Sequence, residues 1–209
     1  MGLIRGSASF TRFFVNGKPP ENYLGDYLER ITRFSFHKLD EYSDEERSTG
    51  WVNIMNIFDN DFSGKDFFMH PYIALSWRID TRKVPRDALN QQLVEAEQEI
   101  KENEELEYLP KERRRELKDF LQHQLLKRAI PKTNTYDMVW NLDSGIIICA
   151  CVNAKLCDEF AEIFLKTFEI PLGSMFPYSL GAHVLGDRGM EPGIIDSLTA
   201  SNFIGDGRE

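Results

Sequence analysis

Two long charged helical segments in the middle of the chain constrain its fold most strongly. Pro85 stands at a favourable first-turn position for a helix, and the apolar residues after it recur at helical spacing. Those of the first helix are Leu89, Leu93, Ala96 and Ile100. Residues 108–110 interrupt the pattern, and a second helix is expected over residues 111–129, with its apolar stripe at Leu117, Phe120, Leu121 and Leu125. The short break between them predicts an antiparallel helical hairpin.

The segments on either side of this hairpin have the character of strands. Aromatic and β-branched residues predict strands at residues 7–15, 51–58, 72–79, 136–142 and 146–152. Short connections join the second strand to the third and the fourth to the fifth, so both pairs are expected to be antiparallel. The last strand is almost continuously apolar, which indicates a central position in the sheet.

Two further helices and a tail complete the expected organisation. Apolar periodicity predicts helices at residues 21–34 and 154–168, the second with Phe160, Ile163, Phe164 and Thr167 facing inward. Residues 40–46 form an acidic loop, and frequent glycine from residue 180 onward predicts a weakly structured tail. A chain of 209 residues with 42% hydrophobic residues can bury a substantial core, so we expect an α+β fold with a central antiparallel sheet.

Charge is distributed unevenly over the hairpin. The formal net charge is −9, which gives no global field that attracts nucleic acid or membrane. Residues 87–109 nevertheless contain eight acids and one base, whereas residues 110–132 contain three acids and eight bases. One interpretation is attraction between an acidic and a basic helix across their seam. The other is a basic stripe that contacts phosphates through Lys111, Arg114, Arg115 and Lys118.

Motifs for catalysis or metal binding are absent from the sequence. Gly17-Lys18 and Gly64-Lys65 lack the Ser or Thr of a phosphate-binding loop, and His70 stands where a calcium loop starting at Asp59 needs glutamate. Cys149, Cys151 and Cys157 have no histidine nearby, and we expect small apolar core residues rather than a soft-metal site. We therefore expect no enzyme activity, no metal, no cofactor and no small-molecule substrate. Three cysteines favour a reducing compartment, and the longest apolar run, residues 146–152, is far short of a membrane span.

Several motifs occur in an order that resembles one known family. An apolar strand ends in Arg78 and continues through Asp80 and Arg82 to Val84-Pro85, which opens a helix. The other motifs are Gly50-Trp51-Val52, Leu117-Lys118-Asp119, residues 125–130, Trp140, Gly145-Ile146-Ile147 and Asn153-Ala154-Lys155. Together they resemble the bacterial recombination-associated RdgC family over residues 5–178, although Lys127 and Ile130 stand where that family usually has Pro and Phe.

The resemblance implies a function and an architecture. RdgC proteins bind double-stranded DNA without sequence preference, form ring-shaped homodimers around it and restrain RecA-driven recombination. The implied domains are a central α+β unit over residues 1–83 and 130–178, a projecting hairpin tip over residues 84–129, and a Gly-rich tail over residues 179–209. The family has a further C-terminal domain. The short tail here leads us to expect a short form, for which the resemblance leaves undecided whether a ring closes.

The resulting site prediction combines the basic segment with the family motif. The residues expected to bind double-stranded DNA are Arg78, Arg82, Lys83, Arg113, Arg114, Arg115, Lys118, Arg128 and Lys132. We expect a cytoplasmic, nucleoid-associated homodimer or other homo-oligomer, and Ala129 and Ile130 are candidates either for contacts between tips or for core packing. The alternative is a protein–protein interaction module that keeps the fold but has lost DNA binding.

Overall fold

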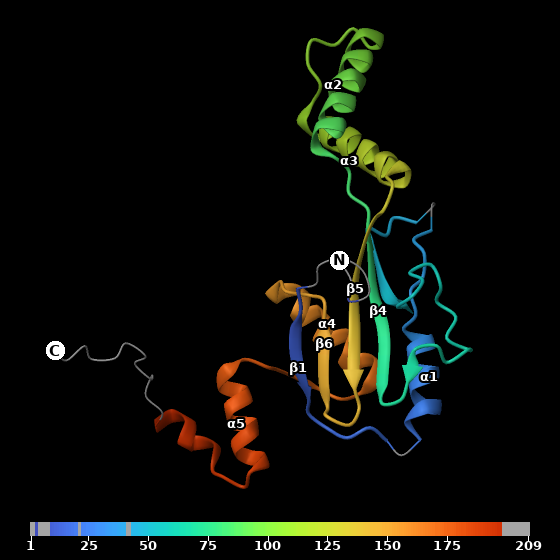
Figure 1. Ribbon diagram of the computed structural model, residues 1–209. Coiled ribbons are helices and arrows are strands. Elements are labelled where there is room, and N and C mark those ends of the chain that lie inside the picture. The colour runs from blue at the N-terminus through green and yellow to red at the C-terminus, as the bar shows by residue number, and fades with distance from the viewer. Residues whose placement is uncertain (1–2, 4–8, 21, 41–42, 198–209) are drawn as a thin grey trace, which may run out of the picture.

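A computed structural model describes residues 3, 9–20, 22–40 and 43–197. Within these residues, seven antiparallel strands form one sheet in the order β2-β4-β5-β6-β1-β7, and β3 pairs with β4 (Figure 1). The strands are β1 (Thr11–Val15), β2 (Arg47–Asn53), β3 (Phe68–Met69), β4 (Tyr72–Thr81), β5 (Lys132–Asn141), β6 (Ile146–Cys149) and β7 (Leu172–Ser174). The sheet confirms the predicted α+β class, and β6 lies between β5 and β1, away from the edges, as its apolar sequence predicts.

Two helices, α1 (Tyr23–Arg33) and α4 (Ala154–Phe168), cover one face of the sheet. Asn153 caps α4 by accepting a hydrogen bond from the backbone N–H of Leu156, which fixes the start of that helix. Aromatic rings from the helices and the sheet interlock in the core: Tyr27, Trp51, Trp77, Trp140, Phe160, Phe164 and Phe168. Burial of these large apolar surfaces is the main stabilising contribution.

The opposite face of β4 carries polar side chains that are also buried. Residues 73, 75, 77 and 79 face the helices, and the alternate residues Ser76, Arg78 and Asp80 lie on the other side, each at most 8% exposed. Segments outside the strands cover this face, since the carbonyl of Ile57 and the ring of Phe36 both contact Arg78. β4 is therefore buried on both sides, and its polar groups are satisfied within the protein.

Gly50 in β2 permits the close approach of the backbone of residues 35–36. A Cβ atom at this position would lie 2.5 Å from the backbone N and Cα of Phe36. We expect Gly50→Ala to lower the free energy of unfolding by about 1–3 kcal/mol, because the backbone of residues 35–36 must shift. The matched control is Gly186→Ala, where a Cβ meets nothing within 4 Å. Urea unfolding checks both, and equal effects of the two substitutions would contradict the steric explanation.

The helical hairpin projects beyond the ends of two neighbouring strands. α2 (Arg86–Asn103) and α3 (Lys111–Arg128) are inserted between β4 and β5, whose pairing continues to Thr81 and Lys132 at the base of the hairpin (Figure 1). At the other side of the molecule, α5 (Pro177–Asp187) and the 3₁₀ helix η1 (Pro192–Ser197) pack on each other. No helix within the described residues is long and apolar enough to cross a membrane.

Several element predictions are confirmed and two need correction. The 154–168 helix has the predicted bounds, and its inward residues Phe160, Phe164 and Thr167 are buried. The tail prediction is wrong over residues 180–197, where α5 and η1 form, and residues 198–209 lie outside the described residues, as do residues 7–8 of the first predicted strand. The 51–58 strand lies instead at Arg47–Asn53, because the side chain of Asn53 accepts a hydrogen bond from the N–H of Met55 and the chain turns.

Candidate nucleic-acid interface

The hairpin has a small apolar core of its own. Leu89, Leu93 and Leu121 are buried between α2 and α3, and the partly buried residues around them are Val84, Ala96, Leu117 and Leu125. This cluster is separate from the sheet core and confirms most of the predicted stripe. Phe120 is the exception, because its side chain is 58% exposed on the outside of α3.

Two of the predicted DNA-binding arginines pair with the acidic helix. Arg113 contacts both carboxylate oxygens of Glu104, and the Nε of Arg114 contacts Glu97. The hydrogen bond from Arg113 lowers the pKa of Glu104 below its usual value. These pairs run across the antiparallel seam, so attraction between the two helices accounts for part of the charge pattern.

The four other predicted site residues of the basic segment are exposed to solvent. Arg115 and Lys118 on α3, Arg128 at its end and Lys132 at the start of β5 are exposed. None of these four forms an ion pair within the described part of the chain, whereas Lys127 lies 4.0 Å from Asp44 of the sheet domain. His123, one turn before Lys127, lies 3.0 Å from the same carboxylate. Four of the predicted residues therefore retain charges that are available to a polyanion.

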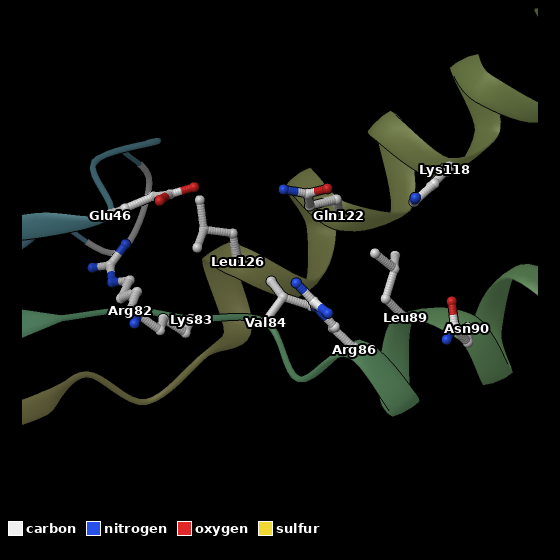
Figure 2. Close-up of a pocket in the computed structure, with 10 residues that line it drawn as sticks. All are labelled: Glu46, Arg82, Lys83, Val84, Arg86, Leu89, Asn90, Lys118, Gln122 and Leu126. Atoms are coloured by element: carbon white, nitrogen blue, oxygen red, sulfur yellow. The ribbon is translucent and has the colours of Figure 1, made fainter.

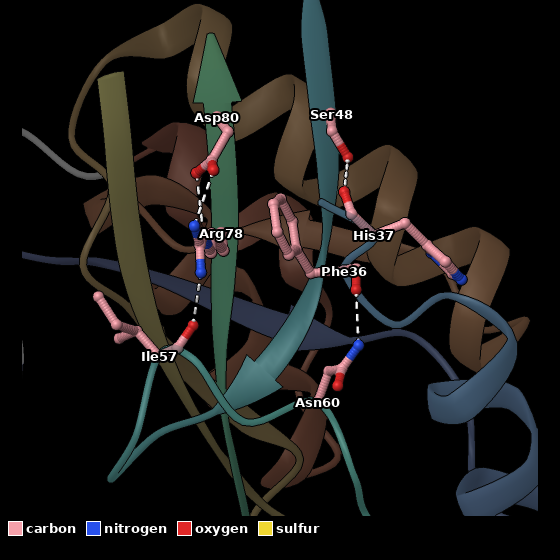
Figure 3. Close-up of polar contacts among 7 residues, drawn as sticks. All are labelled: Phe36, His37, Ser48, Ile57, Asn60, Arg78 and Asp80. Atoms are coloured by element: carbon pink, nitrogen blue, oxygen red, sulfur yellow. Dashed lines mark hydrogen bonds and ion pairs between the residues drawn. The ribbon is translucent and has the colours of Figure 1, made fainter. Parts of the chain in front are cut away.

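Arg78 lies in the interior and has a complete set of partners (Figure 3). Its guanidinium contacts both carboxylate oxygens of Asp80 at 2.9 and 2.7 Å and donates to the carbonyl of Ile57 at 2.9 Å. The ring of Phe36 stacks on it at 4.2 Å. Burial acts to raise the pKa of Asp80, but hydrogen bonds from Arg78 and Thr133 outweigh burial and lower it. This burial does not favour the predicted contact of Arg78 with DNA.

Arg82 is also buried, at 2% exposure, and it organises the loop before β2. Its two terminal nitrogens donate to the carbonyls of Asp40 and Ser43 at 2.6 and 3.3 Å. This loop also carries Asp44, whose carboxylate contacts His123 of α3. Arg82 therefore supports the neck, which we define as residues 82–85 and 129–131, the two segments that join the hairpin to the sheet. Among the described residues its Nε has no hydrogen-bond partner. The prediction of direct DNA contact therefore does not carry over to Arg82 either.

A cleft of about 610 Å³ lies at the base of the hairpin (Figure 2). Arg82 and Lys83 line it from the end of β4, Arg86 from the first turn of α2, and Lys118 from α3. Its lining is completed by Glu46, Val84, Leu89, Asn90, Gln122 and Leu126. Arg86 was missed at the sequence level. Its signal is a cation at the N-terminus of a helix, where the helix dipole disfavours positive charge.

No group of three or more His, Cys, Asp or Glu side chains in the described part of the chain is placed to hold a metal ion. Cys149 and Cys151 are buried as expected, and the Sγ atoms of Cys151 and Cys157 are 3.6 Å apart. Burial of these side chains agrees with the apolar interpretation.

A family model described as "Putative exonuclease, RdgC" matches residues 26–179, which is most of the 209-residue chain. A search of curated proteins finds no match. The family match runs from within α1 into α5 and includes the whole hairpin and the strands around it. It confirms the resemblance carried by the motifs, and the chain belongs to the RdgC family.

Proposed function

We propose that this protein binds double-stranded DNA without sequence preference and acts in recombination or its restraint. The observation that carries the proposal is the set of exposed cations on a projecting hairpin of an otherwise acidic chain: Arg115, Lys118, Arg128 and Lys132. Such cations bind backbone phosphates and release condensed counterions, which gives affinity that does not depend on base sequence. Arg113 and Arg114 lie beside them and contribute less, since acidic partners already occupy them.

The proposed activity is binding without cleavage. The family description contains the word exonuclease, and metal-dependent nucleases need convergent carboxylates or histidines to hold their ions. The described residues present no such group, and the cations on the hairpin serve phosphate binding. The protein is accordingly proposed to occupy duplex DNA as a nucleoid-associated, cytoplasmic component.

Self-association is part of the proposal. Large apolar side chains stand exposed on the hairpin and its neck, namely Val94, Tyr108, Phe120 and Ile130. Contacts between hairpins of two copies would remove this surface from water and place two basic segments on one duplex. Ala129 and Ile130 were the candidates for such a contact. Ile130 is 91% exposed, so it is available for a contact between copies rather than for core packing.

Fluorescence anisotropy with a labelled random duplex tests the function. We expect binding at low salt, with log K falling linearly in log salt at a slope of about −3.6, since four neutralised phosphates contribute about −0.9 each. The duplex should stay intact with Mg²⁺ present, and sedimentation of the complex should show two copies of the chain. Absence of binding at low salt would reject the DNA proposal and favour the protein-interaction alternative. Shortening of the duplex would reject binding without cleavage.

A further inference from the structure

The neck cleft combines features that point to one bound anion. Lys83, Arg86 and Lys118 line it, and none of the three forms an ion pair within the described ranges. Glu46 is the single acid in its lining, and Asn90 and Gln122 add amide donors. Figure 2 shows that Lys83, Arg86 and Lys118 come from three different segments and that Lys118 extends from α3 toward α2. Three exposed cations therefore border one recess.

The walls of the cleft strengthen its attraction for an anion. Leu89 and Leu126 are almost fully buried and form part of its lining together with Val84. Apolar walls lower the local dielectric, which strengthens charge interactions compared with an open surface.

We propose that this cleft holds a single backbone phosphodiester of the bound DNA. The inference rests on the proposed function and assigns the three cations a shared task. Because they line one recess, they neutralise one phosphate together, whereas Arg115, Arg128 and Lys132 stand apart along the hairpin and neck and contact separate phosphates. A phosphate in the cleft touches the end of β4, the first turn of α2 and the middle of α3. Its binding therefore fixes the angle between hairpin and sheet.

The salt dependence of binding distinguishes one shared phosphate from three separate ones, since counterion release counts phosphates and not cations. We expect the cleft variant Lys83→Gln/Arg86→Gln/Lys118→Gln to reduce the slope by about 0.9 and the affinity about eightfold at about 0.1 M salt. A reduction by about 2.7 would overturn the shared site, as would an unchanged slope. All three side chains are exposed, and a thermal melt verifies that the variant is folded.

A second arm separates failure of the cleft from failure of DNA binding. Inorganic pyrophosphate is titrated into ¹⁵N-labelled protein, and shifts are followed at the amides of residues 82–90 and 118–126. We expect shifts in the wild type and in an Arg115→Gln/Arg128→Gln/Lys132→Gln variant, and none in the cleft variant. Shifts in the wild type without duplex binding would keep the anion site and reject the DNA proposal. Duplex binding with no shifts at these amides would keep the function and reject the cleft.

Discussion

Replacing Arg115, Arg128 and Lys132 together with Gln is expected to weaken duplex binding about 500-fold at about 0.1 M salt. Each of these side chains is exposed and without an ion-pair partner in the described residues, so each is assigned its own phosphate. Three lost contacts reduce the slope of log K against log salt by about 2.7. At about 0.1 M salt, which is one decade below 1 M, the affinity of the variant is then about 2.7 decades below that of the wild type, or about 500-fold. Anisotropy measured at several salt concentrations checks both quantities.

The matched control removes the same charge from elsewhere. Lys18, Lys65 and Lys155 are exposed on the sheet domain, away from the hairpin, and their combined change to Gln gives the same net charge. We expect this control to bind duplex with nearly the wild-type slope, because long-range attraction is screened beyond about 10 Å at this ionic strength. Equal losses in the two triple variants would show that net charge matters and the hairpin does not.

Arg78→Met is expected to destabilise the fold by about 3–5 kcal/mol. The substitution leaves the carboxylate of Asp80 buried without its guanidinium partner, which lies 2.7 Å away in the wild type. It also removes the stacking on Phe36 and the hydrogen bond to the carbonyl of Ile57. Urea unfolding followed by circular dichroism measures the change, and a loss below about 1 kcal/mol would contradict the structural assignment.

The double variant Arg78→Met/Asp80→Leu separates burial of a charge from loss of packing. Removing both partners leaves no unpaired charge, so its stability should lie closer to the wild type than that of either single variant. Because Arg78 is not placed at the interface, the folded double variant should bind duplex with wild-type affinity. Weakened binding by a stable double variant would return Arg78 to the DNA-contacting set.

The fold class, the hairpin and the central strand could be predicted because local patterns and tertiary packing agree there. α4 combines a capping Asn153, a strong apolar stripe and a stop near Pro171, and its bounds match. The predicted position of β2 was wrong because the first residues of this strand, from Arg47, are polar and become a strand only by pairing with β4. α5 was missed because its glycines suggested a tail, although Pro177 opens a helix there.

Charge pattern located the basic segment but could not separate exposed cations from buried ones. Arg78 and Arg82 belong to a family motif, and their burial depends on loops that fold over β4 from distant parts of the chain. A local signal exists for Arg78, because Asp80 follows at i+2 and therefore lies on the same side of the strand. The acidic partners of Arg113 and Arg114 depend on the register of the two helices of the hairpin, which a single sequence does not provide.

The insertion point of the hairpin determines how the molecule carries force. Both ends of the hairpin continue into interior strands, β4 and β5, which are paired as far as Thr81 and Lys132. A pull on the hairpin acts along both strands in the same direction, and the β2–β4 and β5–β6 ladders resist it in shear. Many hydrogen bonds then share the load at once, instead of breaking one after another. A tension applied to the arm is thereby spread over the breadth of the sheet.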